Sequence, residues 1–422
     1  MQRFTGFIGI ILILGIAFLF SNNKKRINLR LVGSGILLQV LIGLLVFKVP
    51  FVNLFFQKLG KGMEKIEGFA KKGADFAYGG TGAVDFTGNL VNFNAPGTFV
   101  FAFNITATII LVCVLVAVFY HLGIMQRIVS MIARAMNWIM RVSGAEALSN
   151  VASAFVGQVE AQIMIRPYLA TMTRSELLAS MSGSLACIAG GILIVYANMG
   201  LRAGLDITPN LIAASLMAAP GALVISKIVY PETEESQTMR KVKLEVHSNY
   251  SNLIDAISHG AADGFKIAMT VIAMIIGFIS LIAMIDWCLL KTGHIFNPDL
   301  QLSLNYIFGK LFFPFAWAMG IPMQDVNNAA TLLGQKITIN EFVAFSNLTN
   351  KTVPILTEKG LLITTVAICG FANFSSVGMQ IGGIGALAPE RRADLARLGM
   401  RALLCGTLAS YLSATIAGIL FG

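Results

Sequence analysis

The chain has 422 residues, of which 56% are hydrophobic and only 12% are charged, and its mean hydropathy is +0.76. No soluble domain of this size needs so apolar a composition, so the sequence excludes a soluble globular protein and predicts a polytopic membrane protein. Lys and Arg exceed Asp and Glu by 31 to 21. Because this excess lies largely in short loops between apolar segments, it orients membrane helices, and no nucleic-acid partner is expected.

Windows of about 20 apolar residues, the length that crosses a bilayer as a helix, predict eight spans. They lie near residues 4–21, 31–50, 98–121, 176–199, 208–229, 265–290, 359–385 and 397–421. The first is expected to be a retained span, because no small-residue cleavage pattern follows it before the basic loop. Segments 51–80, 123–141 and 301–318 are expected to be amphipathic helices that lie in the membrane interface.

The basic loops predict how the chain is oriented in the membrane. Five of them fall on one side if the N-terminus lies outside the cell, and that side is then the cytoplasm. These loops cover residues 24–30, 127–141, 166–174, 227–243 and 390–397. Both termini are therefore expected to be external. The lysines of segment 51–80 fall on the opposite side, which is acceptable for an interfacial helix that also carries Glu64, Glu67 and Asp75.

Two segments, 144–172 and 320–350, are too polar to be simple spans and are predicted to be re-entrant hairpins, named hairpin 1 and hairpin 2. Each would enter and leave the membrane on the same side, with its irregular backbone sheltered by protein. Three crossings separate the two, so hairpin 1 opens from the cytoplasm and hairpin 2 from outside. The two halves are therefore predicted to form an inverted repeat, which is typical of transporters with a site between the halves.

A weak internal similarity supports this repeat. Residues 150–158 and 327–335 both begin with Asn and end with Gly-Gln, and they share an Ala at matched spacing. Each copy is followed by a carboxylate, Glu160 in the first and Glu341 in the second. The two copies are therefore expected to occupy corresponding places in the two hairpins.

The functional site is expected around residues 155–162, where a Gly, two Gln and a carboxylate interrupt an apolar segment. Such groups are costly at membrane depth and mark substrate or ion pathways, although a polar kink or a surface loop is the alternative. Each hairpin is followed by a span with a run of small residues, at 183–191 and at 369–378. These runs are expected to unwind and expose carbonyl groups to a ligand, with close helix packing as the alternative.

Five polar residues of these segments make a cluster that is rich in hydrogen-bond acceptors and short of fixed cations: Gln158, Glu160, Glu341, Asn373 and Ser376. This argues for a neutral, polyhydroxylated substrate, because hydroxyls donate to carboxylates while amides read the edge of a heterocycle. Phe371 could supply a flat apolar face. Either glutamate could instead carry a proton. Glu146 and Glu176, near the hairpin ends, are expected to be solvated or to cap helices.

The cysteines and histidines give no pattern that predicts a metal or an enzyme. The five cysteines lie in apolar segments or at their ends without a Cys-x-x-Cys pair, and the four histidines are scattered. Neither a disulfide framework nor a metal cluster is therefore expected. An intramembrane enzyme is disfavoured, because the sequence also has no Asp-rich diphosphate motif and no Ser-His or Cys-His arrangement.

Four runs together resemble the concentrative nucleoside transporter family in a bacterial-length form, over nearly the whole chain. They are Gly-Gln-Val-Glu-Ala at 157–161, Asn-Glu-Phe-Val-Ala at 340–344, Cys-Gly-Phe-Ala-Asn-Phe-Ser-Ser at 369–376 and Leu-Ala-Pro-Glu-Arg-Arg at 387–392. The resemblance implies a homotrimer in the lipid bilayer of the bacterial inner (plasma) membrane. It further implies a scaffold of residues 1–141 and 231–319, and a transport domain of 142–230 and 320–422 that moves like an elevator and is driven by a cation gradient.

The resemblance also assigns site residues. It implies that Gln158 and Val159 face the base, that Phe371 and Ile192 line the substrate site, and that four polar residues hold the ribose. These four are Glu160, Glu341, Asn373 and Ser376. For the coupling sodium ion it implies Ser153, Val156, Cys187 and Ile188, with the carbonyl groups of Val156 and Ile188 as ligands.

The sequence departs from the family at three of these positions. Sodium-coupled relatives usually have Asn at the place of Ser153 and a Ser ligand at the place of Cys187, and proton-coupled relatives carry Ser at the first place. Val159 replaces a Thr that is common in the family. The sodium site is therefore expected to be weakened, and the function is predicted to be cation-coupled import of nucleosides such as uridine. Sodium is the first choice of coupling ion and a proton is the alternative. The inverted repeat disfavours a passive facilitator.

Overall fold

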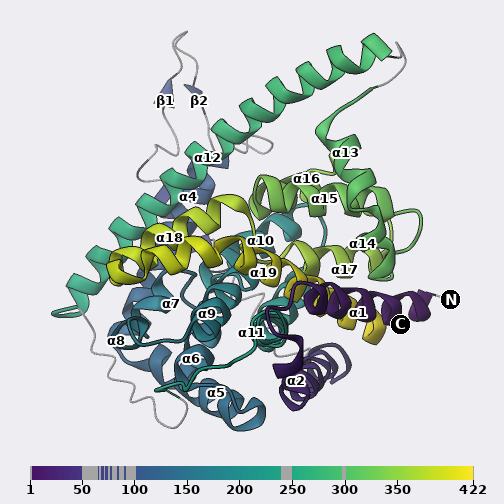
Figure 1. The fold of residues 1–422 in the computed structure, drawn as a ribbon. Helices are drawn as coiled ribbons and strands as arrows, with labels where there is room; N and C mark the ends of the chain where they lie inside the picture. The colour runs from purple at the N-terminus through teal and green to yellow at the C-terminus, as the bar shows by residue number, and fades with distance from the viewer. Residues whose placement is uncertain are drawn as a thin grey trace.

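The computed structural model describes residues 2–49, several positions between 65 and 77, residues 83–84, 90–91, 101–238, 250–296 and 301–421. Its first half contains α1 (Gln2–Leu19), η1 (Lys24–Arg26), α2 (Leu29–Lys48), α4 (Phe101–His121), α5 (Ile124–Met140), α6 (Gly144–Ser153), α7 (Glu160–Ile163), α8 (Arg166–Leu169), α9 (Arg174–Ala186), α10 (Gly190–Arg202) and α11 (Thr208–Val229). Its second half contains α12 (Leu253–Phe296), α13 (Leu304–Leu311), α14 (Phe313–Ala318), α15 (Val326–Thr338), α16 (Glu341–Thr349), α17 (Glu358–Ile368), α18 (Phe374–Leu387), η2 (Pro389–Arg391) and α19 (Arg392–Phe421). The fold is almost entirely helical (Figure 1), apart from an antiparallel pair of short strands, β1 (Ala83–Val84) and β2 (Leu90–Val91).

Every predicted span falls on a helix or on a pair of helices in sequence. Within the described residues, four helical segments are long and apolar enough to cross a membrane, and a fifth is added if α4 and α5 are taken as one bent span. The predicted number of eight crossings therefore stays a prediction. Most of segment 51–80, including Glu64, Glu67 and Asp75, lies outside the described residues, so its interfacial helix also stays a prediction.

The amphipathic segment at 123–141 is a separate helix, as predicted. Gly123 adopts φ +72, a left-handed conformation that glycine accepts without steric cost, and it ends the preceding span. Helix α5 then leaves α4 at 76°. In the second half, segment 301–318 forms two short helices, α13 and α14, rather than one.

The first hairpin begins with a strong helix start and turns at a glycine. Ser143 and Glu146 form a capping box at the start of α6, which satisfies backbone N–H groups that the helix itself leaves free. The helix ends at Ser153, and residues 154–159, named tip 1, are not helical. Gly157 within tip 1 has φ +120, which a residue with a Cβ would adopt only under strain. The chain returns through the short helices α7 and α8.

Both predicted interruptions in the following spans are confirmed. Helix α9 ends at Ala186 and α10 begins at Gly190, so residues 187–189 form break 1. Helix α17 ends at Ile368 and α18 begins at Phe374, so residues 369–373 form break 2. The two breaks touch, because the Phe371 N–H donates to the Cys187 carbonyl at 3.2 Å.

The predicted register of the internal repeat is wrong. Gly157 and Gln158 lie in tip 1, whereas Gly334 and Gln335 lie inside α15 and the second turn, named tip 2, comes later at residues 339–340. A Cβ added at Gly334 would lie 2.4 Å from Cβ of Phe308. This glycine therefore allows α15 to pack closely on α13, and it does not form a turn.

Helices α4 and α12 form one closely packed pair. The long helix α12 runs beside α4 and continues beyond it towards α13 (Figure 1). A Cβ added at Gly260 would lie 2.8 Å from Cα of Val114, and one at Gly264 would lie 2.7 Å from Cα of Ile110. Small residues four apart thus bring the two backbones together, as in other membrane helix pairs.

The rest of the fold is built around α11 and α19, which pack against each other; α11 is almost fully buried, and α19 is buried over most of its length from Ala402 to Gly418. Helices α1 and α2 pack on the outside of this pair. The two halves of the chain repeat one arrangement: α6 of hairpin 1 packs on α9, and α15 of hairpin 2 packs on α17. The tips of both hairpins are thereby brought to the broken spans.

Of the two alternatives predicted for Glu146 and Glu176, helix capping is confirmed and solvation is wrong. Their exposed fractions are 2% and 0%. Oε2 of Glu146 lies 2.7 Å from the Lys227 ammonium, which comes from α11. Glu176 accepts hydrogen bonds from the Ser236 and Thr238 hydroxyls. Both carboxylates are buried because side chains distant in sequence neutralise or bond them.

Candidate functional site

The predicted ribose-binding residues Glu341, Asn373 and Ser376 lie together in one buried network. Glu341 starts α16 directly after tip 2, and its Oε2 accepts a hydrogen bond from the Asn373 Nδ2 at 2.8 Å. Asn373 is the N-cap of α18, where its Oδ1 accepts from the Ser376 N–H at 2.8 Å. The helix cap therefore fixes the side chain whose other end holds the glutamate.

The Gln158 side chain joins this network from tip 1. Its Nε2 donates to the Ser376 hydroxyl at 3.4 Å, and its Oε1 accepts from the Gln380 Nε2 at 3.5 Å. Both contacts are long, so they hold the amide weakly. The structure thus connects Gln158, Ser376, Asn373 and Glu341 across the two halves of the chain.

Tyr196 of α10 also belongs to the network, although the sequence did not single it out. Its hydroxyl donates to Oε1 of Glu341 at 3.3 Å, and its ring stacks on Phe345 with 4.3 Å between the centroids. In the sequence, the only feature that could have indicated Tyr196 as a site residue is its phenol group within an apolar segment. Ile192, a predicted substrate residue, is half-buried one helical turn before Tyr196 and shares its face of α10.

The apolar residues predicted at the site lie at the edges of the network. Phe371 is half-buried in break 2, directly after Gly370 and two residues before Asn373. Val159 packs on α18, since a Cβ added at Gly383 would lie 2.7 Å from its Cγ1. Val159 and Phe371 are therefore placed on the two segments, tip 1 and break 2, that also supply the polar groups.

Glu160 is placed differently from the other predicted ribose ligands. Its side chain is exposed, and its Oε2 lies against Gly157, where an added Cβ would come within 2.5 Å. Its charge acts on Cys113 of α4, as does that of Asp263 of α12. Glu160 therefore interacts electrostatically with a residue of α4, whereas Glu341 is held by a hydrogen bond to Asn373.

The predicted cation residue Ser153 lies in a chain of buried hydroxyl and amide groups. Its hydroxyl donates to the Ser149 carbonyl at 2.7 Å and lies 2.8 Å from the Ser184 hydroxyl. Ser184 also accepts from the Gln162 Nε2 at 2.7 Å, and the Gln162 Oε1 accepts from the Ser180 hydroxyl at 2.7 Å. Ser184 and Gln162 were not predicted here, although both stand in polar runs that the sequence singles out.

The other three predicted cation residues lie where tip 1 meets break 1. These two segments are joined by a hydrogen bond from the Gly190 N–H to the Phe155 carbonyl at 3.1 Å. Within the described part of the chain, no backbone N–H donates to the carbonyl of Val156 or Ile188. The Cys187 thiol turns to the Asn150 carbonyl, 3.7 Å away.

The donor set around tip 1 fits a hard cation in part. Two hydroxyl oxygens, of Ser153 and Ser184, and the two carbonyl oxygens of Val156 and Ile188 are the kind of ligand that hard cations prefer. The Cys187 sulfur is not, and it is already directed at a carbonyl. These residues therefore suit a sodium ion held by few, uncharged ligands.

A buried lysine that the sequence did not place at the site interacts electrostatically with the network. Lys336 of α15 is 0% exposed, and its ammonium has no hydrogen-bond partner among the described residues. Its charge acts on Glu341. The sequence does contain a sign of it, because a lone lysine in the apolar stretch 332–339 is costly at membrane depth.

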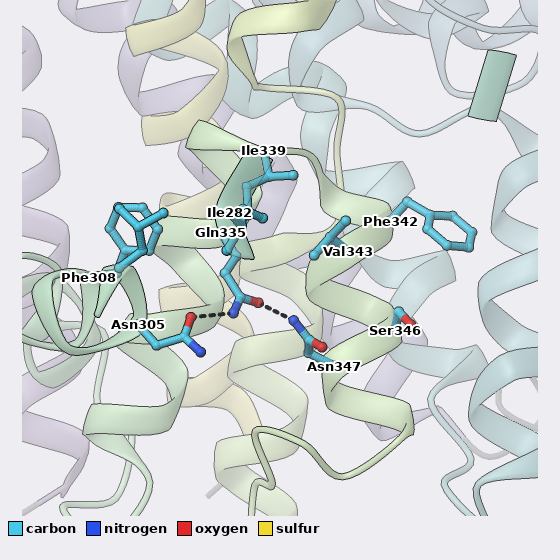
Figure 2. A pocket seen from close by; sticks show the side chains of 10 residues that line it. Ile282, Asn305, Phe308, Gln335, Ile339, Phe342, Val343, Ser346 and Asn347 are labelled. Atoms are coloured by element: carbon cyan, nitrogen blue, oxygen red, sulfur yellow. Dashed lines mark hydrogen bonds between the residues drawn. The ribbon is translucent and has the colours of Figure 1, made fainter. Parts of the chain in front are cut away.

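A cavity of about 210 Å³ lies behind hairpin 2 and is separate from the network. It lies between α12, α13, α15 and α16, and none of the predicted substrate residues lines it. Figure 2 shows Gln335 bridging two neighbours: its Nε2 donates to Oδ1 of Asn305 at 2.7 Å, and its Oε1 accepts from Nδ2 of Asn347 at 2.9 Å. Gln335 therefore braces hairpin 2, and it does not repeat the role of Gln158.

Three family models match the chain. A model described as the C-terminus of a Na+ dependent nucleoside transporter matches residues 210–418, and its N-terminal counterpart matches residues 8–81. A third, described as nucleoside recognition, matches residues 102–202. The third match covers the segment that contains α6, tip 1, α9 and α10.

Named relatives are similar over the whole chain. The nucleoside permease NupC of Helicobacter pylori is 38% identical over 98% of this chain and 97% of its own length. The sodium/nucleoside cotransporter 1 of Rattus norvegicus is 36% identical over 100% of this chain and 64% of its own, longer sequence. The shared region therefore includes both hairpins and both broken spans.

Solved structures of CNTnw have the same fold. Its inward-facing, substrate-bound state has a TM-score of 0.88 at 37% identity, with 99% of both chains covered. A CNTnw variant in an outward-facing state has a TM-score of 0.91 at 38% identity, over 100% of this chain and 99% of the other.

Proposed function

This chain belongs to the Na+ dependent, concentrative nucleoside transporter family, and we propose that it imports nucleosides across a bacterial inner membrane together with sodium. The observation that carries the proposal is the buried network that links Gln158 of tip 1 to Ser376, Asn373 and Glu341 of the second half. This network offers one carboxylate and three neutral polar side chains. Members of the family are transporters, so no enzymatic activity is assigned.

The network suits the two parts of a nucleoside. The Glu341 carboxylate and the Asn373 amide present acceptors and donors to ribose hydroxyls, and bonds to a charged acceptor are the stronger kind. Gln158 presents a donor and an acceptor to the edge of a base. Its present contacts are 3.4 and 3.5 Å long, so a base can replace them at little cost. We use uridine as the test substrate.

The architecture proposed for transport has eight crossings, two hairpins of opposite orientation, external termini and a homotrimeric assembly in the lipid bilayer. Residues 1–141 and 231–319 would form the scaffold, and 142–230 and 320–422 the mobile transport domain. The close packing of α4 on α12 supports a rigid scaffold, and the contacts α6–α9 and α15–α17 support two equivalent halves. The known inward-facing and outward-facing states of CNTnw support an elevator-like movement.

Sodium is the coupling ion that we propose, with Ser153, Ser184 and the carbonyls of Val156 and Ile188 as its ligands. When bound, the ion would supply a positive charge that joins tip 1 to break 1. The chain's own hydrogen bond from Gly190 to Phe155 already holds these segments together, and Gln158 follows three residues later. Coupling would then arise because the same turn that positions the ion ligands also positions the base-binding amide.

A proton is the second candidate, and one observation favours it. Ser153, Ser184 and Gln162 satisfy one another through hydrogen bonds, and Cys187 supplies sulfur in place of oxygen. When the hydroxyl and amide groups of a site already bond to one another, an ion must displace these bonds, so sodium binds weakly. In that case Glu160 or Glu341 would carry the proton.

Uptake of labelled uridine into liposomes that contain the purified protein tests the proposal. We expect accumulation above the external concentration with an inward sodium gradient, and equilibration without it. The same assay with choline, at two pH values, separates sodium coupling from proton coupling. Uptake that never exceeds equilibration under any gradient would identify a passive facilitator and contradict the proposed function.

A further inference from the structure

The helix caps give the register of the inverted repeat that the sequence did not. Equivalent helices begin at the N-caps Ser143 and Asp325 and at the N-caps Thr173 and Thr357, and the first helix of each broken span ends at Cys187 and Cys369. The same spacing sets Ser153 of hairpin 1 opposite residues 335–337 of hairpin 2, a stretch that begins with Gln335 and contains Lys336. Lys336 therefore stands in the part of hairpin 2 that corresponds to the end of α6, where the first half has the proposed cation ligand Ser153.

The surroundings of Lys336 agree with this correspondence. Its charge interacts with Cys369 of break 2, and the helix that carries it, α15, packs on α17, the helix that ends at this break. Its side chain is fully buried, and its ammonium has no hydrogen-bond partner in the described part of the chain. A fully buried ammonium group thus belongs to the last turn of α15, which leads into tip 2, on a helix that packs against the broken span.

A buried ammonium without hydrogen bonds is expensive unless an anion compensates its charge. Glu341 is the anion near it, and this carboxylate is itself 7% exposed. Glu341 accepts from Asn373 and Tyr196, but both of these donors are neutral. Without a cation, a carboxyl group in so dry a site would take up a proton and lose its value as an acceptor.

We propose that Lys336 is a built-in cation of the second half, which keeps Glu341 ionised for nucleoside recognition. It acts as a positioning residue, because it reaches the substrate only through Glu341. The proposal rests on the proposed function, in which Glu341 binds ribose. The first half of the transporter would then use a mobile cation, and the second half the fixed charge of Lys336.

The pH dependence of nucleoside binding distinguishes this role from a structural one. The titratable groups that face Glu341 are Lys336 from α15, Tyr196 from α10 and Cys369 from break 2, and Cys187 lies next to Cys369. The phenol and the thiols stay neutral in their ordinary ranges at and below neutral pH. Any pH dependence that appears there when Lys336 is replaced therefore reports on Glu341.

The test measures uridine binding to the purified full chain by calorimetry across a pH series, in wild type and in Lys336→Met. Wild type is expected to bind with little pH dependence and without proton exchange. Lys336→Met should bind more weakly than wild type at neutral pH, and its affinity should fall further as the pH is lowered, by about tenfold per pH unit while the free carboxyl group is protonated. In two buffers of different ionisation enthalpy it should release about one proton on binding.

A matched control is Lys351→Met, since Lys351 is an exposed lysine directly after hairpin 2. It should bind uridine as wild type does at every pH. If Lys336→Met also does so, without proton release, the inference is overturned while the proposed function stands. If wild type itself fails to bind uridine, the proposed function fails first.

A double variant keeps the inference testable if Lys336→Met is unstable. Lys336→Met with Glu341→Gln removes both charges, so it should recover thermal stability relative to Lys336→Met alone. Equal instability of the single and double variants would show that the lysine does not compensate Glu341, and would overturn the inference.

Discussion

Replacing Glu341 by Gln removes the only charge that we assign to ribose binding and keeps the size of the side chain. The carboxylate accepts at Oε2 from Asn373 and at Oε1 from Tyr196. A glutamine retains one acceptor oxygen, so one ribose hydroxyl loses a charge-assisted bond worth about 1.5–3 kcal/mol in a dry site. Uridine should therefore bind about 10- to 150-fold more weakly, as measured by calorimetry on the purified protein.

Two controls isolate the ribose. A 2′,3′-dideoxynucleoside does not make the lost bonds, so its affinity should change much less. Glu358→Gln changes an exposed glutamate in the first turn of α17 and should leave uridine binding as it is. If the dideoxy compound loses as much affinity as uridine in Glu341→Gln, the assignment of Glu341 to ribose is refuted.

Three further predictions concern the base, the cation and the topology. Gln158→Ala should weaken binding in a base-dependent way, so equal losses for uridine, adenosine and free ribose would make Gln158 a brace of tip 1. Ser153→Asn, alone or with Cys187→Ser, should raise the sodium dependence of uridine binding by about 1–3 kcal/mol of coupling, and no gain in sodium over choline would argue against the cation site. In a background without native thiols, Thr171→Cys should react with an impermeant thiol reagent only from inside and Gln324→Cys only from outside; labelling of both from one face would contradict the inverted hairpins.

The broken spans could be predicted because their cause is local. Runs of Gly, Ser and Asn weaken a helix wherever they stand, and residues 187–189 and 369–373 are indeed not helical. The register of the repeat could not be predicted in the same way. Gly157 serves a turn and Gly334 serves close packing on Phe308, and only the distant packing partner distinguishes the two roles.

The polar side chains at membrane depth could be named from the sequence, but their partners could not. Gln158, Asn373 and Glu341 are conspicuous in apolar segments, and the structure joins them. Tyr196 and Lys336 were not predicted, because each contributes to the site only through its interaction with Glu341. Tyr196 lies on α10 and Lys336 on α15, so only the packing of these helices around tip 2 sets them beside Glu341.

The burial of Glu146 could not be predicted for the same reason, because it depends on a residue distant in sequence. Its place in a capping box follows from Ser143 three residues earlier, which is a local pattern. Its burial follows from Lys227, which lies on another helix, α11. A carboxylate near a hairpin end therefore could not be recognised as buried before the lysine was placed beside it.

The measurement that bears most directly on the proposed function is uridine accumulation in liposomes under an imposed sodium gradient, with Glu341→Gln beside the wild type. We predict that wild type concentrates uridine only with the inward sodium gradient, and that Glu341→Gln does so far less. Accumulation that is equal in sodium and choline but rises as the external pH falls would replace sodium by the proton. Failure to accumulate uridine under either gradient would contradict coupled nucleoside import.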